Sequence, residues 1–427
     1  MRKDSGNSSN SKSKRTKINK RFLKVTLLFF ILYSLFAGYY FNRIYQPWGT
    51  CDTDFTVFTR AAADLAQKKD IYAVSYLETG VDFYKYSPAF AFFLIPLSKL
   101  HKHISVPIWY LGIFISFMGA LFLTKKILLA DNQEKVLSPG FYFLAIIFSL
   151  RSLLSVVQRV QSDCLVLFLL AIFIYALFRR RQILAGLALA SAVMVKLTPL
   201  IFLPYLLLRK KFKAAFACGL FTIFYSLLPA VYVGWARNFE YLKNFILVHQ
   251  KNPADYFIWY KNQSLHSSLL RFFTSGSGQV SILNLRPSQV WIIFLILGAS
   301  LFSLVFILCR KTRPQETPLG YLTEISLILV LMVILSPLAW KHSFIHLLIA
   351  QMVLLYYLFY ASARDKVTWS LFLGSFLLNT ILNPELTKSA AALIQEYSNV
   401  TFGALLIYAA LLRVKCKLSL LSQPTTK

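Results

Sequence analysis

Long apolar stretches recur along the chain, separated by short polar segments. The first is Phe22–Phe41. The others lie at about 88–100, 107–124, 138–153, 162–178, 183–195, 198–208, 214–234, 289–309, 319–337, 343–361, 367–382 and 400–413. A helix of about 20 apolar residues crosses the hydrocarbon core of a bilayer. The pattern therefore predicts an all-α integral membrane protein, a polytopic bundle of roughly 10–13 transmembrane helices.

The composition supports a membrane protein and leaves no room for a large soluble domain. Of the 427 residues, 57% are hydrophobic and 15% are charged, whereas soluble chains contain about 45–50% apolar residues. The five cysteines are scattered, so neither a disulfide framework nor a zinc site is expected. The chain has no strand-borne G-x-G-x-x-G, no P-loop and no G-x-S-x-G, which argues against a Rossmann-like nucleotide-binding domain.

The net charge of +29 does not indicate nucleic acid, because the basic residues form short clusters between apolar stretches. Such clusters are typical of cytoplasmic loops, and they attract anionic lipid headgroups. Residues 1–21 are rich in Ser, Asn and Lys and predict a disordered cytoplasmic tail. The stretch Phe22–Phe41 lacks a convincing cleavage site and predicts an uncleaved first helix that runs outward.

The basic clusters predict most of the topology. Arg179–Arg181 and Arg209–Lys211 are both expected in the cytoplasm, so the chain between them forms a short hairpin with Lys196 near its outer tip. If Pro88–Leu100 crossed the membrane completely, the later loops would lie on the wrong side. This stretch is therefore expected to be a short or re-entrant segment. The resulting organisation is a membrane domain over 22–413, outer loops at 42–87, 235–288, 336–343 and 383–399, and a cytoplasmic tail at 414–427.

The first outer loop carries the clearest candidate for chemistry. Asp52 and Asp54 flank one residue, shortly after the first helix. Such a pair binds Mg²⁺ or Mn²⁺ with a sugar diphosphate, or supplies a general base, or is simply a solvated acidic loop. Phe55, Phe58, Ala62 and Leu65 follow at helical spacing, which predicts a short helix on the membrane surface.

Several other polar residues stand where apolar stretches meet outer loops. Tyr86 is either an interface anchor or a ring that stacks on a sugar. Gln161 and Asp163 are candidates for function, with a structural Arg159–Asp163 pair as the alternative. Lys196 either binds an anion, such as a lipid phosphate, or reaches past the apolar surface to water. Further candidates in the later outer loops are Asn262, Gln263, Arg271 and His342. His346 lies one turn beyond His342, but no third ligand is nearby, so zinc is discounted.

These motifs, taken in order, resemble a known family. They are Asp54-Phe55-x-x-Phe58, Asp70-Ile71-Tyr72, Tyr84-x-Tyr86-Ser87-Pro88, Pro96-Leu97, Gln161-Ser162-Asp163, Lys196-Leu197-Thr198-Pro199, Asn262-Gln263-Ser264-Leu265 with Arg271, and Ser336-Pro337-x-x-Trp340-x-His342. The series is similar to multi-pass GT-C glycosyltransferases, closest to glycosyltransferase family 87. A looser likeness exists to the first mannosyltransferase of the GPI-anchor pathway. Two positions depart from the family 87 pattern: Val160 replaces a usual glycine, and Lys341 and Ser343 flank His342 where a second histidine is common.

The resemblance implies a GT-C-like bundle and a hexosyltransferase, mannosyltransferase-like. It implies a transfer that inverts the sugar's configuration and takes place on the outer face. The donor would be a polyprenyl phosphate that carries mannose or another hexose, and the acceptor would be a lipid or a glycan. Asp54 aligns with the catalytic base of the family. Lys196, Arg271 and His342 would stabilise the leaving phosphate, while Asp52, Tyr86, Gln161, Asp163, Asn262 and Gln263 would bind sugar or acceptor.

The expected cofactors, partners and location follow from the same resemblance. A phosphate leaving group needs no metal clamp, so no cofactor or metal is expected. Loss of activity to a chelator with recovery by Mn²⁺ would overturn this. The expected partners are donor, acceptor and membrane lipids, without nucleic acid, and a bacterial inner membrane is the expected location. A multi-pass lipid or solute transporter is the alternative, since polar residues near helix junctions also suit a substrate pathway. A non-catalytic scaffold of a glycan-assembly complex is a third option.

Overall fold

The computed structural model describes residues 7–45, 53–76, 83–132, 136–251, 255–276, 280–311, 317–382 and 390–421. Within these ranges the chain is helical, and the β-structure is limited to one bridge between Ser75 and Phe83. The helices are α1 (Asn7–Tyr45), α2 (Asp54–Ala66), α3 (Pro88–Ser98), α4 (Lys102–Leu128), α5 (Pro139–Arg159), α6 (Asp163–Phe178), α7 (Gln182–Val195), η1 (Thr198–Ile201), α8 (Phe202–Leu208), α9 (Phe212–Leu227), α10 (Ala230–Val233), α11 (Trp235–Val248), η2 (His249–Lys251), α12 (Asp255–Ile258), α13 (Leu265–Phe273), α14 (Pro287–Lys311), α15 (Pro318–Ile334), η3 (Lys341–Leu347), α16 (Leu348–Tyr356), η4 (Tyr357–Ala361), α17 (Lys366–Phe376), η5 (Leu377–Ile381), α19 (Ala390–Glu396) and α20 (Asn399–Leu421).

Apolar helices long enough to cross a membrane dominate the fold. By length and composition, 7 segments in the described part of the chain qualify. They are Leu23–Tyr45, Lys102–Leu128, Pro139–Arg159, Phe212–Val233, Pro287–Leu308, Lys341–Ala361 and Asn399–Ser419. Shorter apolar helices, α6, α7 and α15 among them, pack between these segments. The predicted class, an all-α polytopic membrane protein, is confirmed.

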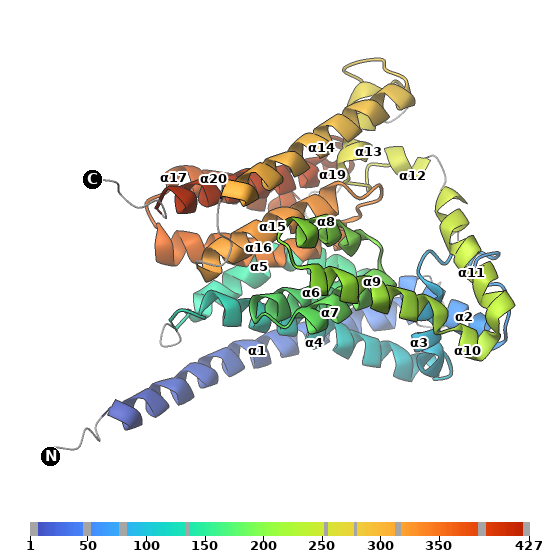
Figure 1. Cartoon of the computed structure of the whole chain (residues 1–427), viewed down its shortest axis with the longest axis horizontal. Helices are drawn as coiled ribbons and strands as arrows, with labels where there is room; N and C mark the ends of the chain where they lie inside the picture. Colours follow the sequence, from blue (N-terminus) through green and yellow to red (C-terminus); the bar gives the residue numbers. More distant parts are fainter. Residues whose placement is uncertain are drawn as a thin grey trace.

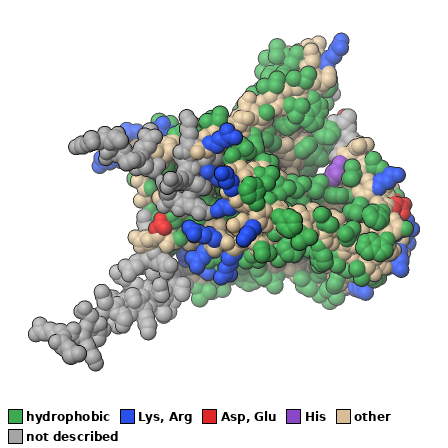
Figure 2. Space-filling view, viewed as in Figure 1, with side chains coloured by type: hydrophobic (Ala, Val, Ile, Leu, Met, Phe, Trp, Pro, Cys, Tyr) green, Lys and Arg blue, Asp and Glu red, His purple; other side chains and the backbone are tan. Residues whose placement is uncertain are grey.

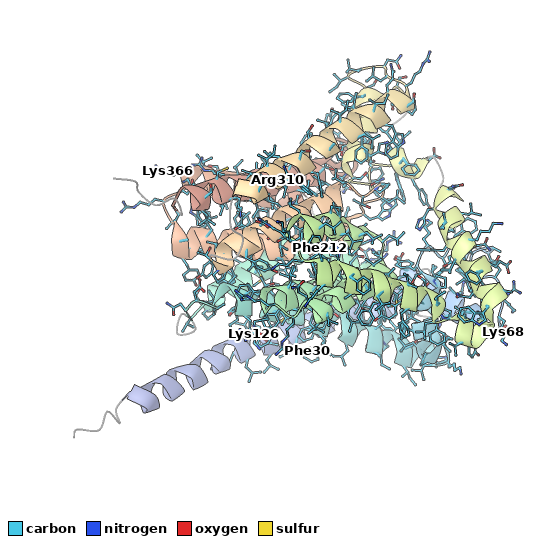
Figure 3. All side chains as sticks on the ribbon, viewed as in Figure 1. Phe30, Lys68, Lys126, Phe212, Arg310 and Lys366 are labelled. Carbon is cyan, nitrogen blue, oxygen red and sulfur yellow. The ribbon has the colours of Figure 1, made fainter. Side chains whose placement is uncertain are left out.

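The helices of the bundle run broadly along one axis, with both chain termini at the same end (Figure 1). We call that end the basic end, because the three-residue turns Arg179–Arg181 and Arg209–Lys211 lie there, together with the C-terminal part of α20. At the opposite end, which we call the site end, α2, α3, α10 and α11 gather beyond the main bundle (Figure 1). Figure 3 shows Lys366 at the basic end and Lys68 at the site end.

The short hairpin predicted between the two basic clusters is present. Helix α7 leaves the basic end and stops at Val195, and η1 with α8 returns to Leu208. Lys196 follows α7 directly, at the tip of the hairpin. Helix α3 spans only 11 residues, about 16 Å at 1.5 Å per residue, which is too short to cross a bilayer. The prediction that Pro88–Leu100 is a short segment is therefore also confirmed.

Two buried acids hold the basic end together. Glu324 of α15 accepts hydrogen bonds from Arg209, including one from Nε at 2.6 Å, and from Lys415 Nζ at 3.1 Å. Asp365 accepts bonds from Lys417 Nζ at 2.7 Å and from Arg413 Nε at 3.2 Å. Because a buried carboxylate is costly without a charged partner, these clusters fix α20 against α15 and α17.

Both ends of the chain are more helical than expected. Helix α1 begins at Asn7, inside the segment predicted to be disordered. Helix α20 continues to Leu421, and Lys415 is buried, although a cytoplasmic tail was expected from residue 414. The reason at the C-terminus is that Lys415 of α20 pairs with Glu324, while Arg413 and Lys417 pair with Asp365.

Candidate active site

Helix α2 presents Asp54 at its first turn. Thr53 caps the helix, and its hydroxyl accepts a hydrogen bond from Thr56 N at 3.3 Å. Phe55 and Phe58 are buried, which gives this short helix an apolar face to pack on the bundle. The predicted short helix is thus present, and its place at the membrane surface stays a prediction. Asp52, the other acid of the predicted pair, lies outside the described residues.

Aromatic contacts connect α2 to the turn that precedes α6. Phe55 packs on Trp109 of α4 with ring centroids 5.1 Å apart, and Phe58 packs on Tyr86 at 4.7 Å. Both partners bond Gln161: Trp109 Nε1 donates to its carbonyl oxygen at 3.3 Å, and the Tyr86 hydroxyl donates to Oε1 at 3.2 Å. The helix that begins with Asp54 is therefore anchored next to Gln161.

A strained turn sets the direction of α6. Val160 is fully buried and has a left-handed backbone, with φ of 54° and ψ of 48°. Gln161 N donates to Val156 O at 3.0 Å across this turn, which ends α5. A β-branched residue rarely adopts this conformation, whereas glycine does so readily. The turn is what separates Arg159 from Asp163, the first residue of α6.

Asp163 is the centre of a buried cluster of charged and titratable side chains. Lys196 Nζ donates to its Oδ2 at 2.7 Å, and the side chains of Asp163 and Lys196 are 0% and 18% exposed. His342 Nε2 lies 3.8 Å from Oδ2, and His346 Nδ1 lies 4.0 Å from Oδ1. Both histidines come from η3, so α6, the hairpin tip and η3 meet at one carboxylate.

The cluster contains buried polar atoms without a protein partner. Ser162 Oγ, Asp163 Oδ1 and His346 Nε2 make no hydrogen bond to the described residues. His346 Nδ1 lies 2.7 Å from Ser343 O, and it donates there because a carbonyl is only an acceptor. Buried polar atoms normally have partners, so this group of atoms is suited to hold a polar ligand or water.

The side-chain amides of the Asn262–Gln263 motif bind the backbone of distant segments. Asn262 Oδ1 accepts from Ala339 N at 3.0 Å, and its Nδ2 donates to Pro337 O at 3.1 Å. Gln263 Nε2 donates to Gln395 O at 2.8 Å, and its Oε1 accepts from Val400 N at 3.2 Å. Both side chains are fully buried. Asn262 therefore connects the loop before α13 to the segment that precedes η3, and Gln263 connects it to the start of α20.

Arg271 completes the same loop. It is fully buried, and its guanidinium donates to protein oxygens only among the described contacts. The acceptors are Glu396 O at 3.1 Å, Ile258 O at 3.4 Å, Trp259 O at 3.1 Å, Asn262 O at 2.8 Å, Ser267 Oγ at 2.6 Å and Ser398 Oγ at 2.6 Å. Burial lowers the pKa of Arg271 to about 10, still far above neutral pH. The charged guanidinium of Arg271 thus holds several backbone segments together through hydrogen bonds.

Aromatic rings and cations surround the cluster. Trp340, two residues before His342, packs against Tyr256 and Trp259 with centroids 5.9 and 5.6 Å apart. Lys261 Nζ lies 4.3 Å from the centroid of the Trp259 ring. Arg159 is exposed, and its positive charge acts on both Lys261 and His342. This part of the surface suits anionic and sugar-like groups.

The predicted site residues thus divide into two groups. Asp163, Lys196 and His342 meet in one cluster, and Tyr86 with Gln161 adjoins it through the turn before α6. Asn262, Gln263 and Arg271 lie in a separate network of loop contacts. The Arg159–Asp163 pair is not formed, because Asp163 pairs with Lys196. No motif in the sequence indicated Trp109. The spacing of one turn between His342 and His346 was the available signal for a role of His346 in the site.

One known family matches the chain over a region that contains most of the residues described above. The family model of glycosyltransferase family 87 matches residues 83–337, which is more than half of the chain. This region contains Tyr86, Gln161, Asp163, Lys196 and the Asn262–Arg271 loop, and it stops before His342. Asp54 precedes it. No curated protein matches the chain. On this match and the polytopic helical fold, the chain belongs to glycosyltransferase family 87 and is a membrane glycosyltransferase.

Proposed function

We propose that this enzyme transfers a hexose, mannose by family analogy, from a polyprenyl-phosphate donor to a lipid or glycan acceptor on the outer face of its membrane. The observation that carries the proposal is the buried Asp163–Lys196–His342–His346 cluster at the site end. The opposite end carries the basic turns that typify the cytoplasmic side. A lipid-linked donor suits a site that lies at the ends of apolar helices.

Lys196 and His342 of the cluster support the departure of a phosphate. When the bond between the anomeric carbon and the phosphate oxygen breaks, negative charge grows on that oxygen. Lys196 has three ammonium hydrogens, and its bond to Asp163 uses one of them. Asp163 therefore holds the ammonium in place, while the remaining hydrogens are directed at the leaving phosphate. His342 adds a second donor beside it.

Asp54 acts as the general base in this proposal. Its carboxylate takes the proton of the acceptor hydroxyl as that oxygen attacks the anomeric carbon from the side opposite the phosphate, which inverts the configuration. Its position at the first turn of α2 favours the ionised form, since helix N-termini stabilise negative charge. The packing of Phe55 on Trp109, which bonds Gln161, supports a place for Asp54 beside the cluster.

The remaining candidates have supporting roles in the proposal. Tyr86 and Gln161 contact each other next to Asp163 and would orient the transferred sugar. Asn262, Gln263 and Arg271 would act as positioning residues that hold η3, and with it His342, in place. This reassigns Arg271 from direct phosphate binding, because its donors already bind the protein.

The test is a transfer assay with the purified chain, radiolabelled polyprenyl-phosphate-mannose and lipids extracted from native membranes. Wild-type protein is expected to transfer label, and Asp54→Asn is expected to lose roughly 10²-fold or more, the usual contribution of a general base. Asp131→Asn, an exposed acid on the loop after α4, is the matched control and should keep full activity. Equal activity of Asp54→Asn and wild type would remove Asp54 from catalysis, and transport of the donor without transfer would overturn the proposal.

A further inference from the structure

The two basic turns at the basic end are built alike and lie side by side. Arg180 and Lys210, the central residues, both have a left-handed backbone, with φ of 58° and 52°. The third residue closes each turn: Arg181 N donates to Ala176 O and Lys211 N donates to Leu206 O, both at 2.8 Å. Each turn therefore ends one helix and starts the next without using its basic side chains.

Close packing of α7 on α9 brings the two turns together. A Cβ added to Gly186 of α7 would lie 2.5 Å from Ala217 Cβ and 2.6 Å from Ala214 O of α9. Only a glycine permits this close approach, and the contact lies within the first two turns of both helices. The turns that precede the helices are consequently neighbours, and the charges of Arg180 and Arg209 both act on Lys211.

Most of the charge in this paired turn is uncompensated. Of its six basic side chains, Arg209 alone has an ion-pair partner, Glu324, within the part of the chain that the structure describes. Arg179, Arg180, Arg181 and Lys210 are exposed. Cations held this close repel one another, so the arrangement favours binding of an anion that carries more than one charge.

The surface next to the cations is apolar, which indicates the class of anion. Ile183, Leu207, Phe212 and Phe216 are 66%, 53%, 59% and 74% exposed. They lie within one or two turns of the basic residues along α7, α8 and α9. Lys and Arg side chains adjoin hydrophobic ones on this part of the molecule (Figure 2), and Phe212 lies beside α8 in Figure 3. Phe212 and Phe216 belong to the candidate membrane span Phe212–Val233, so an anion bound at the neighbouring cations lies at a lipid surface. A phospholipid can place its headgroup on the cations and its acyl chains on these rings, whereas a soluble phosphate can contact only the cations.

We propose that the paired turn Arg179–Arg181 with Arg209–Lys211 is a specific binding site for the headgroup of an anionic phospholipid, whose acyl chains lie on Ile183, Phe212 and Phe216. A headgroup with two separate phosphodiester groups, as in cardiolipin, matches two neighbouring basic turns. The site lies at the end of the molecule opposite the candidate active site, and the proposal does not depend on the reaction that the enzyme catalyses.

The experiment measures lipid retention by the full chain in detergent, by native mass spectrometry, with cardiolipin or phosphatidylcholine added. The test variant is R180Q/K210Q, which removes two exposed charges and leaves the backbone bonds of the turns in place. A second variant, R179Q/R181Q, checks the same site with other residues. The control is K68Q/K243Q: both lysines are exposed, Lys68 has a φ of 58° like Lys210, and both lie in or beside site-end helices. Thermal unfolding of each variant without lipid confirms that it is folded.

Wild type and the control are expected to retain cardiolipin over phosphatidylcholine, and each test variant is expected to retain roughly tenfold less cardiolipin. Retention of cardiolipin by the test variants at the level of wild type would overturn the proposal. So would a wild type that does not distinguish the two lipids. Sodium pyrophosphate is added in a parallel thermal-unfolding series: stabilisation equal to that by cardiolipin would assign the site to a soluble phosphate instead of a lipid.

Discussion

Val160 illustrates how one residue shapes the candidate site. Its left-handed backbone turns the chain between α5 and α6 and points Asp163 toward Lys196. Such a backbone costs a residue with a Cβ about 1–2 kcal/mol. Glycine, which the resemblance to the family 87 pattern leads us to expect at this position, would avoid that cost. The buried isopropyl group of Val160 offsets part of it through packing.

The two effects can be separated by comparing Val160→Ala with Val160→Gly. Both variants lose the packing of the side chain, but only glycine also relieves the backbone. We expect Val160→Gly to be the more stable of the two by about 1 kcal/mol, measured by thermal unfolding in detergent. At Ala171, within α6, an Ala→Gly change should instead cost about 1 kcal/mol. Greater stability of Val160→Ala would show that the turn is not strained.

The same turn explains why the pairing of Asp163 could not be predicted. In the sequence, Arg159 and Asp163 have the spacing of two residues on one helical face. The left-handed Val160 ends α5 at Arg159, so the two residues belong to different helices. The backbone contacts of Asn262 and Gln263 could not be predicted for a related reason. Their amides bind loop backbone groups whose need for partners is not visible before the loop is folded.

At the scale of the helix, α20 shows how charge is used to fix an element. Arg413 and Lys417 bind Asp365 from one side of α20, and Lys415 binds Glu324 from another. Burial alone would raise the pKa of Asp365, but hydrogen bonds from Lys417, Thr368 and Arg413 outweigh it and lower the pKa well below its usual range. The carboxylate therefore stabilises the fold in its ionised form.

This lowered pKa gives a pH dependence with a defined sign. The contribution of Asp365 is complete above the pKa of an unfolded aspartate, about 3.9, and is lost as the pH falls toward the folded value. We expect wild type to unfold at a higher temperature than Asp365→Asn by a constant margin between about pH 5 and 7. The margin should shrink below about pH 4. Asp131→Asn should show no such margin, and a margin that grows in acid would contradict the assignment.

Elements with a strong apolar pattern could be predicted from the sequence, and the hairpin of α7 with α8 and the short α3 are examples. The extent of α1 and α20 could not. The C-terminal basic residues resembled a solvated tail because their acidic partners, Glu324 and Asp365, are far away in the sequence. Only the folded bundle brings these charges together.

At the scale of the whole molecule, the chain has two chemically different ends. Paired basic turns and the acids of α15 and Asp365 occupy one end, while the Asp163 cluster and helices α2, α3 and α11 lie at the other (Figure 1). When α3 is not counted as a membrane crossing, the number of crossings places the basic clusters on the same side of the membrane. The basic end is then cytoplasmic in our proposal, and the candidate active site faces outward.

This orientation is tested with a membrane-impermeant maleimide on intact cells. We expect Lys68→Cys, at the site end, to be labelled from outside. Arg180→Cys, at the basic end, and the exposed native Cys416 should react only after the cells are opened. The unmodified chain measures background from the native cysteines. Labelling of Arg180→Cys in intact cells, with Lys68→Cys protected, would reverse the proposed orientation.

The ion pair between Lys196 and Asp163 also bears on how the protein is made. The two residues are 33 positions apart, whereas His342 joins them only after most of the chain has been synthesised. An aspartate at the end of an apolar helix is costly to leave unpaired in a bilayer. Asp163 begins α6 and Lys196 follows α7, so this pair of helices contains both charges of the ion pair. The pair can therefore enter the bilayer before the later helices are made, without exposing an unpaired carboxylate to lipid.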